Sequence, residues 1–290
     1  MTDLLITLPF LIGFLYLLVL LTVRGLRWIR GLSLMDRLRL RQALLSKDVF
    51  SAAGEAFMEG LLHRKIFRKH PVLGYMHMSL AFGWFLLIVV GHIETLVADR
   101  SLVVPVYKAV FFRYFETSKD FTMAGSFAVA MDLLLLFVLS GVSLAMAKRF
   151  RKHWFGLRQT TRLKTGDRIA LTSLWLIFPL RLAAEATAAS LWHNGSFLTN
   201  PLGSFIGSHV DAAAIHAPLW FAYSSALGFF FVALPNSRYM HIPAEILLIF
   251  MRRAGVRLKK INTTYTEVQV YSCSRCGICL DRCQLSVAGI

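Results

Sequence analysis

Five stretches of this sequence are each long and apolar enough for a helix to cross a membrane: residues 4–23, 74–97, 121–147, 169–192 and 212–234. A helix needs about 20 apolar residues to cross the hydrocarbon core of a bilayer. The chain is 56% hydrophobic and 17% charged, which is more apolar surface than a soluble domain of this length can bury. We therefore predict an all-α integral membrane protein, a bundle of five transmembrane helices.

The first stretch is interpreted as a retained helix. No basic segment precedes it, and no small-residue cleavage site lies before Arg24, whereas a removed signal peptide would have both.

Lysine and arginine predict the orientation, because basic residues are retained on the cytoplasmic side of a membrane. Of the 32 such residues, 27 lie in residues 24–69, 148–168, 238–260 and the C-terminal tail, and the outer loops hold only Arg100, Lys108, Arg113 and Lys119. The N-terminus is predicted outside and the C-terminus in the cytoplasm, in the inner (cytoplasmic) cell membrane. The formal charge of +16 lies in blocks between apolar runs, which argues against a nucleic-acid partner.

The expected domains are a transmembrane helical part at 1–242, an amphipathic interfacial helix and linker at 243–265, and a metal-binding segment at 266–290. Pro105, Lys108 and Arg113 interrupt the apolar segment 102–115, so we expect it along the outer interface. Residues 48–69 and 243–260 are amphipathic and basic, as helices lying on an anionic inner leaflet would be. A solvated connector explains residues 48–69 equally well.

All four cysteines fall within eleven residues, as Cys273, Cys276, Cys279 and Cys283. The spacing Cys-x2-Cys-x2-Cys-x3-Cys is typical of bacterial ferredoxins, in which it binds an iron–sulfur cluster. Structural zinc prefers two separated pairs, and the chain has no further cysteine for a disulfide framework. We therefore predict a [4Fe-4S] cluster on these four residues.

The cluster motif is incomplete in this chain. In two-cluster ferredoxins the fourth cysteine of a run ligates the other cluster, and a second run supplies the missing ligand. This sequence has no second run, Gln284 replaces the usual proline, and the chain ends seven residues after Cys283. We expect either that the chain is a truncated or naturally split piece, or that a partner completes the cluster.

Four histidines lie within or beside the predicted spans: His77 and His92 near the inner and outer ends of the second, His216 near the outer end of the fifth, and His241 just past its inner end. Ionisable residues inside a membrane are costly and indicate function. His77 and His92 are separated by about 22 Å of helix rise. Pairing His77 with His241 and His92 with His216 would hold two b-type haems, although each histidine could instead be a hydrogen-bonded packing residue.

The remaining histidines are interpreted as surface residues: His63, His70, His153, His193 and His209.

Other buried charge is sparse, and Asp132 lies in the third span. Arg181 and Glu185 are one helical turn apart in the fourth span and can neutralise each other. Arg181 could instead pair with a haem propionate, and Glu94 could accept a proton from a quinol. We therefore treat these three residues as candidate propionate or quinone contacts.

With these features together, the chain resembles the membrane cytochrome b subunits of heterodisulfide reductase-like complexes, relatives of the respiratory nitrate reductase gamma subunit. The resemblance is carried by residues 67–77 (FRKHPVLGYMH), residues 234–241 (LPNSRYMH) and the cysteine run. It implies that His77 and His241 are haem ligands, that quinone is the membrane substrate, and that a soluble cysteine-rich reductase is the cytoplasmic partner. Such families usually carry a histidine twelve residues before the closing proline, where this chain has Tyr223; His216 stands two turns earlier.

The predicted function is that of a membrane electron-transfer subunit embedded in lipid. One or two b haems would relay electrons between menaquinone or another quinone and a cytoplasmic [4Fe-4S] cluster with its reductase partner. A haem-free anchor that tethers an iron–sulfur reductase is the alternative, for which replacing His77 or His241 would leave spectra unchanged. A transporter would have broken helices with polar residues at the midplane, and these spans show few.

Overall fold

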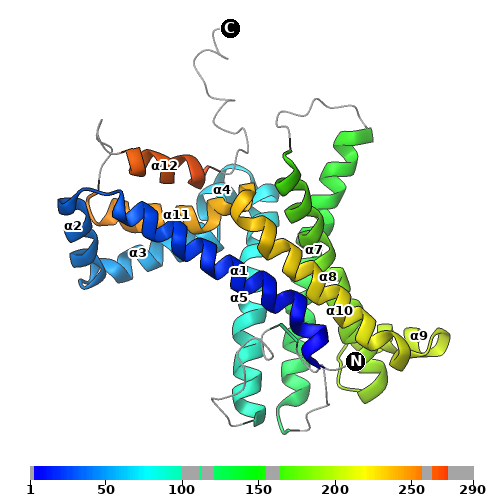
Figure 1. Ribbon diagram of the computed structural model, residues 1–290. Helices are drawn as coiled ribbons and strands as arrows, with labels where there is room; N and C mark the ends of the chain where they lie inside the picture. The colour runs from blue at the N-terminus through cyan, green and yellow to red at the C-terminus, as the bar shows by residue number, and fades with distance from the viewer. Residues whose placement is uncertain (1–2, 100–110, 113–120, 155–162, 257–262, 274–290) are drawn as a thin grey trace. The chain divides into compact units, whose positions relative to one another are not determined.

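The computed structural model describes residues 3–99, 111–112, 121–154, 163–256 and 263–273 (Figure 1), and every regular element in these ranges is helical. The five long helices are α1 (Asp3–Arg30), α5 (Pro71–Asp99), α7 (Ala124–Trp154), α8 (Thr165–Trp192) and α10 (Ala212–Ala233). Each contains a segment long and apolar enough to span a membrane. The five predicted spans of a multi-pass membrane protein are confirmed as long apolar helices. Helices α1 and α7 end seven residues later than expected, and α7 begins three residues later.

Shorter helices lie between and after the spans: α2 (Leu34–Leu44), α3 (Asp48–Ala56), a π-helix (Phe57–Leu61), α4 (Arg64–Lys69), α9 (Thr199–His209), α11 (His241–Arg253) and α12 (Thr263–Ser272). The amphipathic segment 48–69 is thus helical, with the π-helix directly after α3 and one break, at residues 62–63, before α4. Helices α2, α9 and α12 were not expected from the sequence. Of the predicted interfacial segment 102–115, only residues 111 and 112 lie within the described residues.

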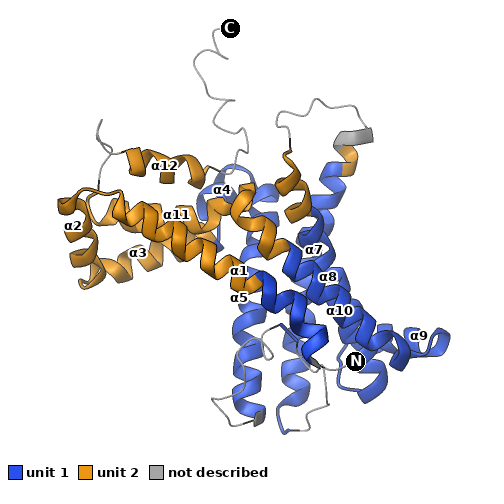
Figure 2. Ribbon diagram, in the orientation of Figure 1, with its two compact units in different colours: residues 1–13, 61–149, 172–229 blue, residues 14–60, 150–171, 230–290 orange. Residues whose placement is uncertain are grey.

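The chain forms two compact units (Figure 2). Unit 1 consists of Met1–Gly13, Leu61–Arg149 and Thr172–Phe229, and unit 2 of Phe14–Gly60, Phe150–Leu171 and Phe230–Ile290. The predicted division at residues 242 and 265 stays a prediction.

In unit 1, helices α1 and α10 pack closely at positions occupied by glycine. A Cβ atom at Gly228 of α10 would lie 2.4 Å from the Pro9 carbonyl oxygen of α1, and one at Gly13 would lie 2.6 Å from the Gly228 Cα. Such backbone-to-backbone contact requires residues without side chains, and small residues are the usual means of helix association in membranes. The start of α1 therefore packs closely on α10.

Unit 2 has its own apolar core around α11. This helix contacts α12, α3 and α2. The buried residues of the core are Trp28, Leu32, Leu40, Met240, Ala244, Leu248, Met251, Val256, Tyr265 and Val268. At one edge, Glu55 of α3 forms ion pairs with Arg252 and Arg253 of α11. The core includes Met240, the residue directly before His241.

Candidate functional site

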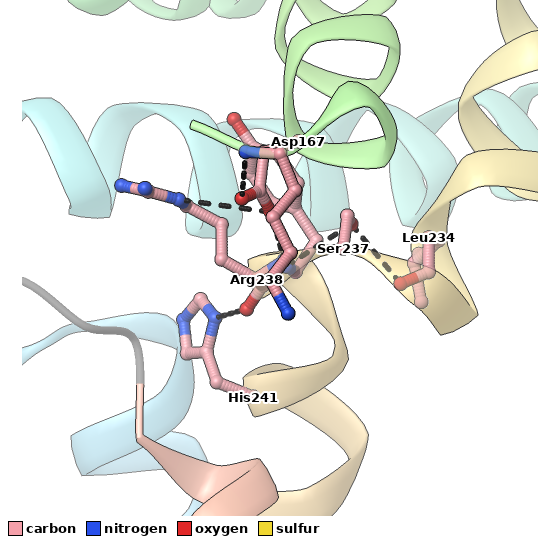
Figure 3. A network of polar contacts seen from close by, with 7 residues as sticks. Asp167, Leu234, Ser237, Arg238 and His241 are labelled. Atoms are coloured by element: carbon pink, nitrogen blue, oxygen red, sulfur yellow. Dashed lines mark hydrogen bonds and ion pairs between the residues drawn. The ribbon is translucent and has the colours of Figure 1, made fainter. Parts of the chain in front are cut away.

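In unit 2, His241 follows a tight turn that ends the fifth span. The chain does not continue as one α-helix: two 3-10 helices, Leu234–Asn236 and Arg238–Met240, separate α10 from α11. Pro235 lies at the break, and proline is poorly tolerated in a helix interior. The His241 Nδ1 atom lies 2.5 Å from the Arg238 carbonyl oxygen (Figure 3). A carbonyl oxygen can only accept, so Nδ1 carries the proton and donates. In the neutral ring, the lone pair is then on Nε2.

Asp167 of α8 holds the turn that presents this carbonyl (Figure 3). Its Oδ1 atom accepts a hydrogen bond of 2.7 Å from the Arg238 backbone N–H, and its Oδ2 atom accepts one of 3.2 Å from the Lys164 N–H at the start of α8. The Arg238 Nε atom lies 3.9 Å from the same carboxylate. One buried acidic side chain thus ties the start of α8 to the residue that orients His241.

A second contact supports the same turn from α1. The Arg24 Nη1 atom donates a hydrogen bond of 2.6 Å to the Pro235 carbonyl oxygen. Ser237 also stabilises the turn, accepting from the Tyr239 N–H at 3.3 Å and donating to the Leu234 carbonyl at 3.0 Å. Hydrogen bonds from the Arg24 and Ser237 side chains therefore stabilise the backbone turn that precedes His241.

In unit 1, His216 of α10 is buried and contacts α8. Its Nδ1 atom lies 2.9 Å from the Thr187 hydroxyl oxygen, which donates its own proton to the Ala184 carbonyl at 2.8 Å. A hydroxyl has one proton to donate, so in this arrangement His216 Nδ1–H is the donor and Nε2 holds the lone pair. The ring also packs edge to face on Trp192, with centroids 5.1 Å apart.

A buried ion pair lies in the same unit on α8. The Arg181 Nε atom is 2.7 Å from the Glu185 Oε1 atom, and the two side chains are 1% and 5% exposed. This confirms the ion pair predicted from their spacing. Tyr223 of α10 lies near Arg181 and Glu185, and its ring packs edge to face on Trp220, with centroids 5.6 Å apart. Tyr223, where the resembled family carries a histidine, thus belongs to a buried polar group.

His77 stacks on His63, a residue that the sequence placed at the surface. The ring centroids are 5.1 Å apart with 24° between the planes, and His63 is half-buried. The contact forms because α4 folds back on α5: a Cβ atom at Gly74 would lie 2.3 Å from the Phe67 Cα. His63 joins the π-helix to α4 in the left-handed conformation, with φ 50°. Such strain is often stored at functional sites.

His92 and Glu94 lie near the end of α5. Glu94 is buried, and the His92 Nδ1 atom is buried without a hydrogen-bond partner among the residues that the structure describes. A buried imidazole nitrogen that lacks a partner costs free energy, and a ligand would relieve this cost. His92 therefore stays a candidate ligand.

Asp132 has a structural role. Its carboxylate accepts hydrogen bonds from the Leu198 and Thr199 N–H groups, 2.9 and 3.1 Å long, and from the Thr199 hydroxyl. These donors are at the start of α9, whose first N–H groups have no helical partner. Asp132, a buried charge noted in the sequence, thus caps the N-terminus of α9.

The predicted haem pairs stay predictions. His77 belongs to unit 1 and His241 to unit 2; His92 and His216 both belong to unit 1, on α5 and α10. Of the cluster cysteines, Cys273 is described and exposed, and Cys276, Cys279 and Cys283 lie outside the described residues.

A comparison with protein-family models, curated proteins and solved structures finds no match. The class that the fold and these residues define is a multi-pass all-α membrane protein with a buried histidine, His216, in unit 1 and a half-buried one, His241, in unit 2. Its function is inferred from this chain's own residues.

Proposed function

We propose that this chain is a membrane electron-transfer subunit of a quinone-linked oxidoreductase. One or two b-type haems, held by His77 with His241 and by His92 with His216, relay electrons between a membrane quinone and a cytoplasmic [4Fe-4S] cluster on Cys273, Cys276, Cys279 and Cys283. The N-terminus lies outside and the cysteine tail in the cytoplasm, where a cysteine-rich reductase is the partner.

The observation that carries the proposal is the hydrogen bonding of His241 and His216. Each ring donates from Nδ1, to Arg238 O and to Thr187 Oγ1 respectively. Histidines that ligate a metal almost always donate their second ring N–H to such an acceptor, which fixes the tautomer and the ring plane. Both histidines are thus in the form that offers Nε2 to iron. The donor set fits a haem, whose iron takes axial imidazoles in many proteins.

Haem supplies one-electron chemistry, and the chain's residues orient and tune it. Asp167 and Arg238 place a buried carboxylate and a guanidinium beside the His241 turn. Arg181, partly neutralised by Glu185, is a cation suited to a haem propionate, and the buried carboxyl of Glu94 is a group suited to accept a proton from a quinol.

The proposal is tested by the haem content of three single variants. His241→Ala and His216→Ala each remove one proposed ligand and should each lower the b-type absorbance per polypeptide. His209→Ala is the matched control, because His209 also donates from Nδ1 to a backbone carbonyl, that of Phe205 at 2.9 Å, but is exposed. It should retain the parental spectrum.

Parental haem content in both ligand variants would contradict the proposal. A chain that holds iron and labile sulfide but no haem would favour the haem-free anchor instead.

A further inference from the structure

Helix α2 carries an apolar stripe that faces away from the core of unit 2. Leu34 and Leu38 are 65% and 44% exposed, and Leu45, the residue directly after the helix, is 81% exposed. At about 100° per residue, Leu34 and Leu38 lie about 40° apart around the helix axis. Asp36 and Leu40, on the other side, are buried. Soluble surfaces seldom gather large exposed apolar side chains in this way, so the stripe needs an apolar neighbour.

Basic residues flank the stripe. Arg37, Arg39 and Arg41 all lie on α2, whose one acidic residue, Asp36, is buried and accepts a hydrogen bond of 2.7 Å from the Ser33 hydroxyl. Of these three arginines, Arg39 is the one within ion-pair distance of the Asp36 carboxylate, at 3.5 Å. The outward side of α2 therefore exposes leucine and arginine side chains together, the two kinds of group with which a helix binds a membrane interface.

The position of α2 along the chain brings it to the membrane surface. Helix α1 ends at Arg30 and α2 begins at Leu34, so the first turn of α2 is at most about 14 Å from the end of the span. The connection is short and packed, because Leu32 is buried in the unit 2 core. The last turns of α1 expose Val19, Val23 and Leu26, as a lipid-facing helix does.

We propose that α2 lies in the headgroup layer of the leaflet at which α1 ends, and that it binds anionic phospholipid. Leu34, Leu38 and Leu45 enter the boundary of the acyl chains, while Arg37 and Arg41 contact lipid phosphates. Lipid is favoured over a protein partner because the apolar stripe follows directly on a membrane span, and because the accessible charge of α2 is of one sign. Each basic residue near an anionic membrane surface adds electrostatic attraction. This assignment is independent of the proposed haem function.

The test places a photoreactive benzophenone amino acid in the full-length protein, in place of Leu38 or, as matched control, in place of Arg39 on the adjacent face. Both proteins are reconstituted in vesicles of phosphatidylcholine with or without phosphatidylglycerol and irradiated. We expect several-fold more lipid adduct from position 38 than from position 39, measured by mass spectrometry. Equal yields from the two positions would overturn the proposal, as would crosslinks from position 38 to a polypeptide in native membranes.

The charge is tested in the position-38 protein by the pair Arg37→Gln and Arg41→Gln. We expect phosphatidylglycerol adducts to exceed phosphatidylcholine adducts in the parent, and the excess to fall toward one-to-one in the doubly substituted protein. An excess that is unchanged by the substitutions would overturn the anionic-lipid assignment, and the folded state is checked by an unchanged thermal transition in detergent.

Discussion

The two histidine environments, His216 in unit 1 and His241 in unit 2, reach the same ring tautomer by different means. His216 donates to a side chain, Thr187, on another helix and 29 residues away in sequence. His241 donates to a backbone carbonyl three residues before it. One substitution at Thr187 can remove the hydroxyl that accepts from His216. The carbonyl oxygen of residue 238, which accepts from His241, remains when the Arg238 side chain is replaced. The two sites should therefore respond differently to mutation.

The largest expected effect concerns the buried ion pair of unit 1. Glu185→Ala should destabilise the protein by about 3–5 kcal/mol, because it leaves Arg181 charged and buried without its carboxylate. The measurement is unfolding in a mixed-detergent titration. The control is Arg181→Met combined with Glu185→Leu, which removes both charges and should recover most of the lost stability; equal losses in both proteins would contradict this interpretation.

The second prediction compares the two acceptors directly. Thr187→Val removes the acceptor of His216 and should weaken haem binding about 10–100-fold, the usual cost of losing such an outer partner. Thr187→Ser keeps the hydroxyl and should bind normally. Arg238→Ala keeps the backbone carbonyl that accepts from His241 and should change affinity little. Haem titration of apoprotein measures all three, and a loss with Arg238→Ala as large as with Thr187→Val would refute the distinction.

The smallest effect is expected at Asp167. Asp167→Ala removes the acceptor for the Lys164 and Arg238 N–H groups, and a lost cap of this kind costs about 0.5–2 kcal/mol. Asp167→Asn retains an acceptor oxygen and should preserve most of the stability. Thermal unfolding in detergent distinguishes the two variants, and identical transitions for the two would show that the hydrogen bonds contribute nothing.

The sequence predicts those features that depend on neighbours along the chain. The five spans follow from length and composition, and the Arg181–Glu185 pair follows from a separation of four on one helix. The turn before His241 follows from Pro235. Each needs only local geometry, so each is found in the structure.

The features that the sequence does not predict depend on how helices pack. Thr187 meets His216 only through the register of α8 against α10, and Asp132 meets Thr199 across 67 residues. His63 reaches His77 because the backbone of α4 contacts Gly74 and because His63 adopts a left-handed conformation. Gly74 indicates in the sequence that another segment could approach closely, but the sequence does not show that this segment is the backbone at Phe67.

The central claim, that histidines of the membrane helices bind haem, is tested most directly by a reduced-minus-oxidised optical spectrum of the detergent-purified protein with haem quantified per polypeptide. We expect a b-type spectrum: about two haems would support both histidine pairs, and one haem would support His77 with His241 alone. Protein co-produced with the proposed reductase partner that holds iron and labile sulfide but no haem would contradict the claim.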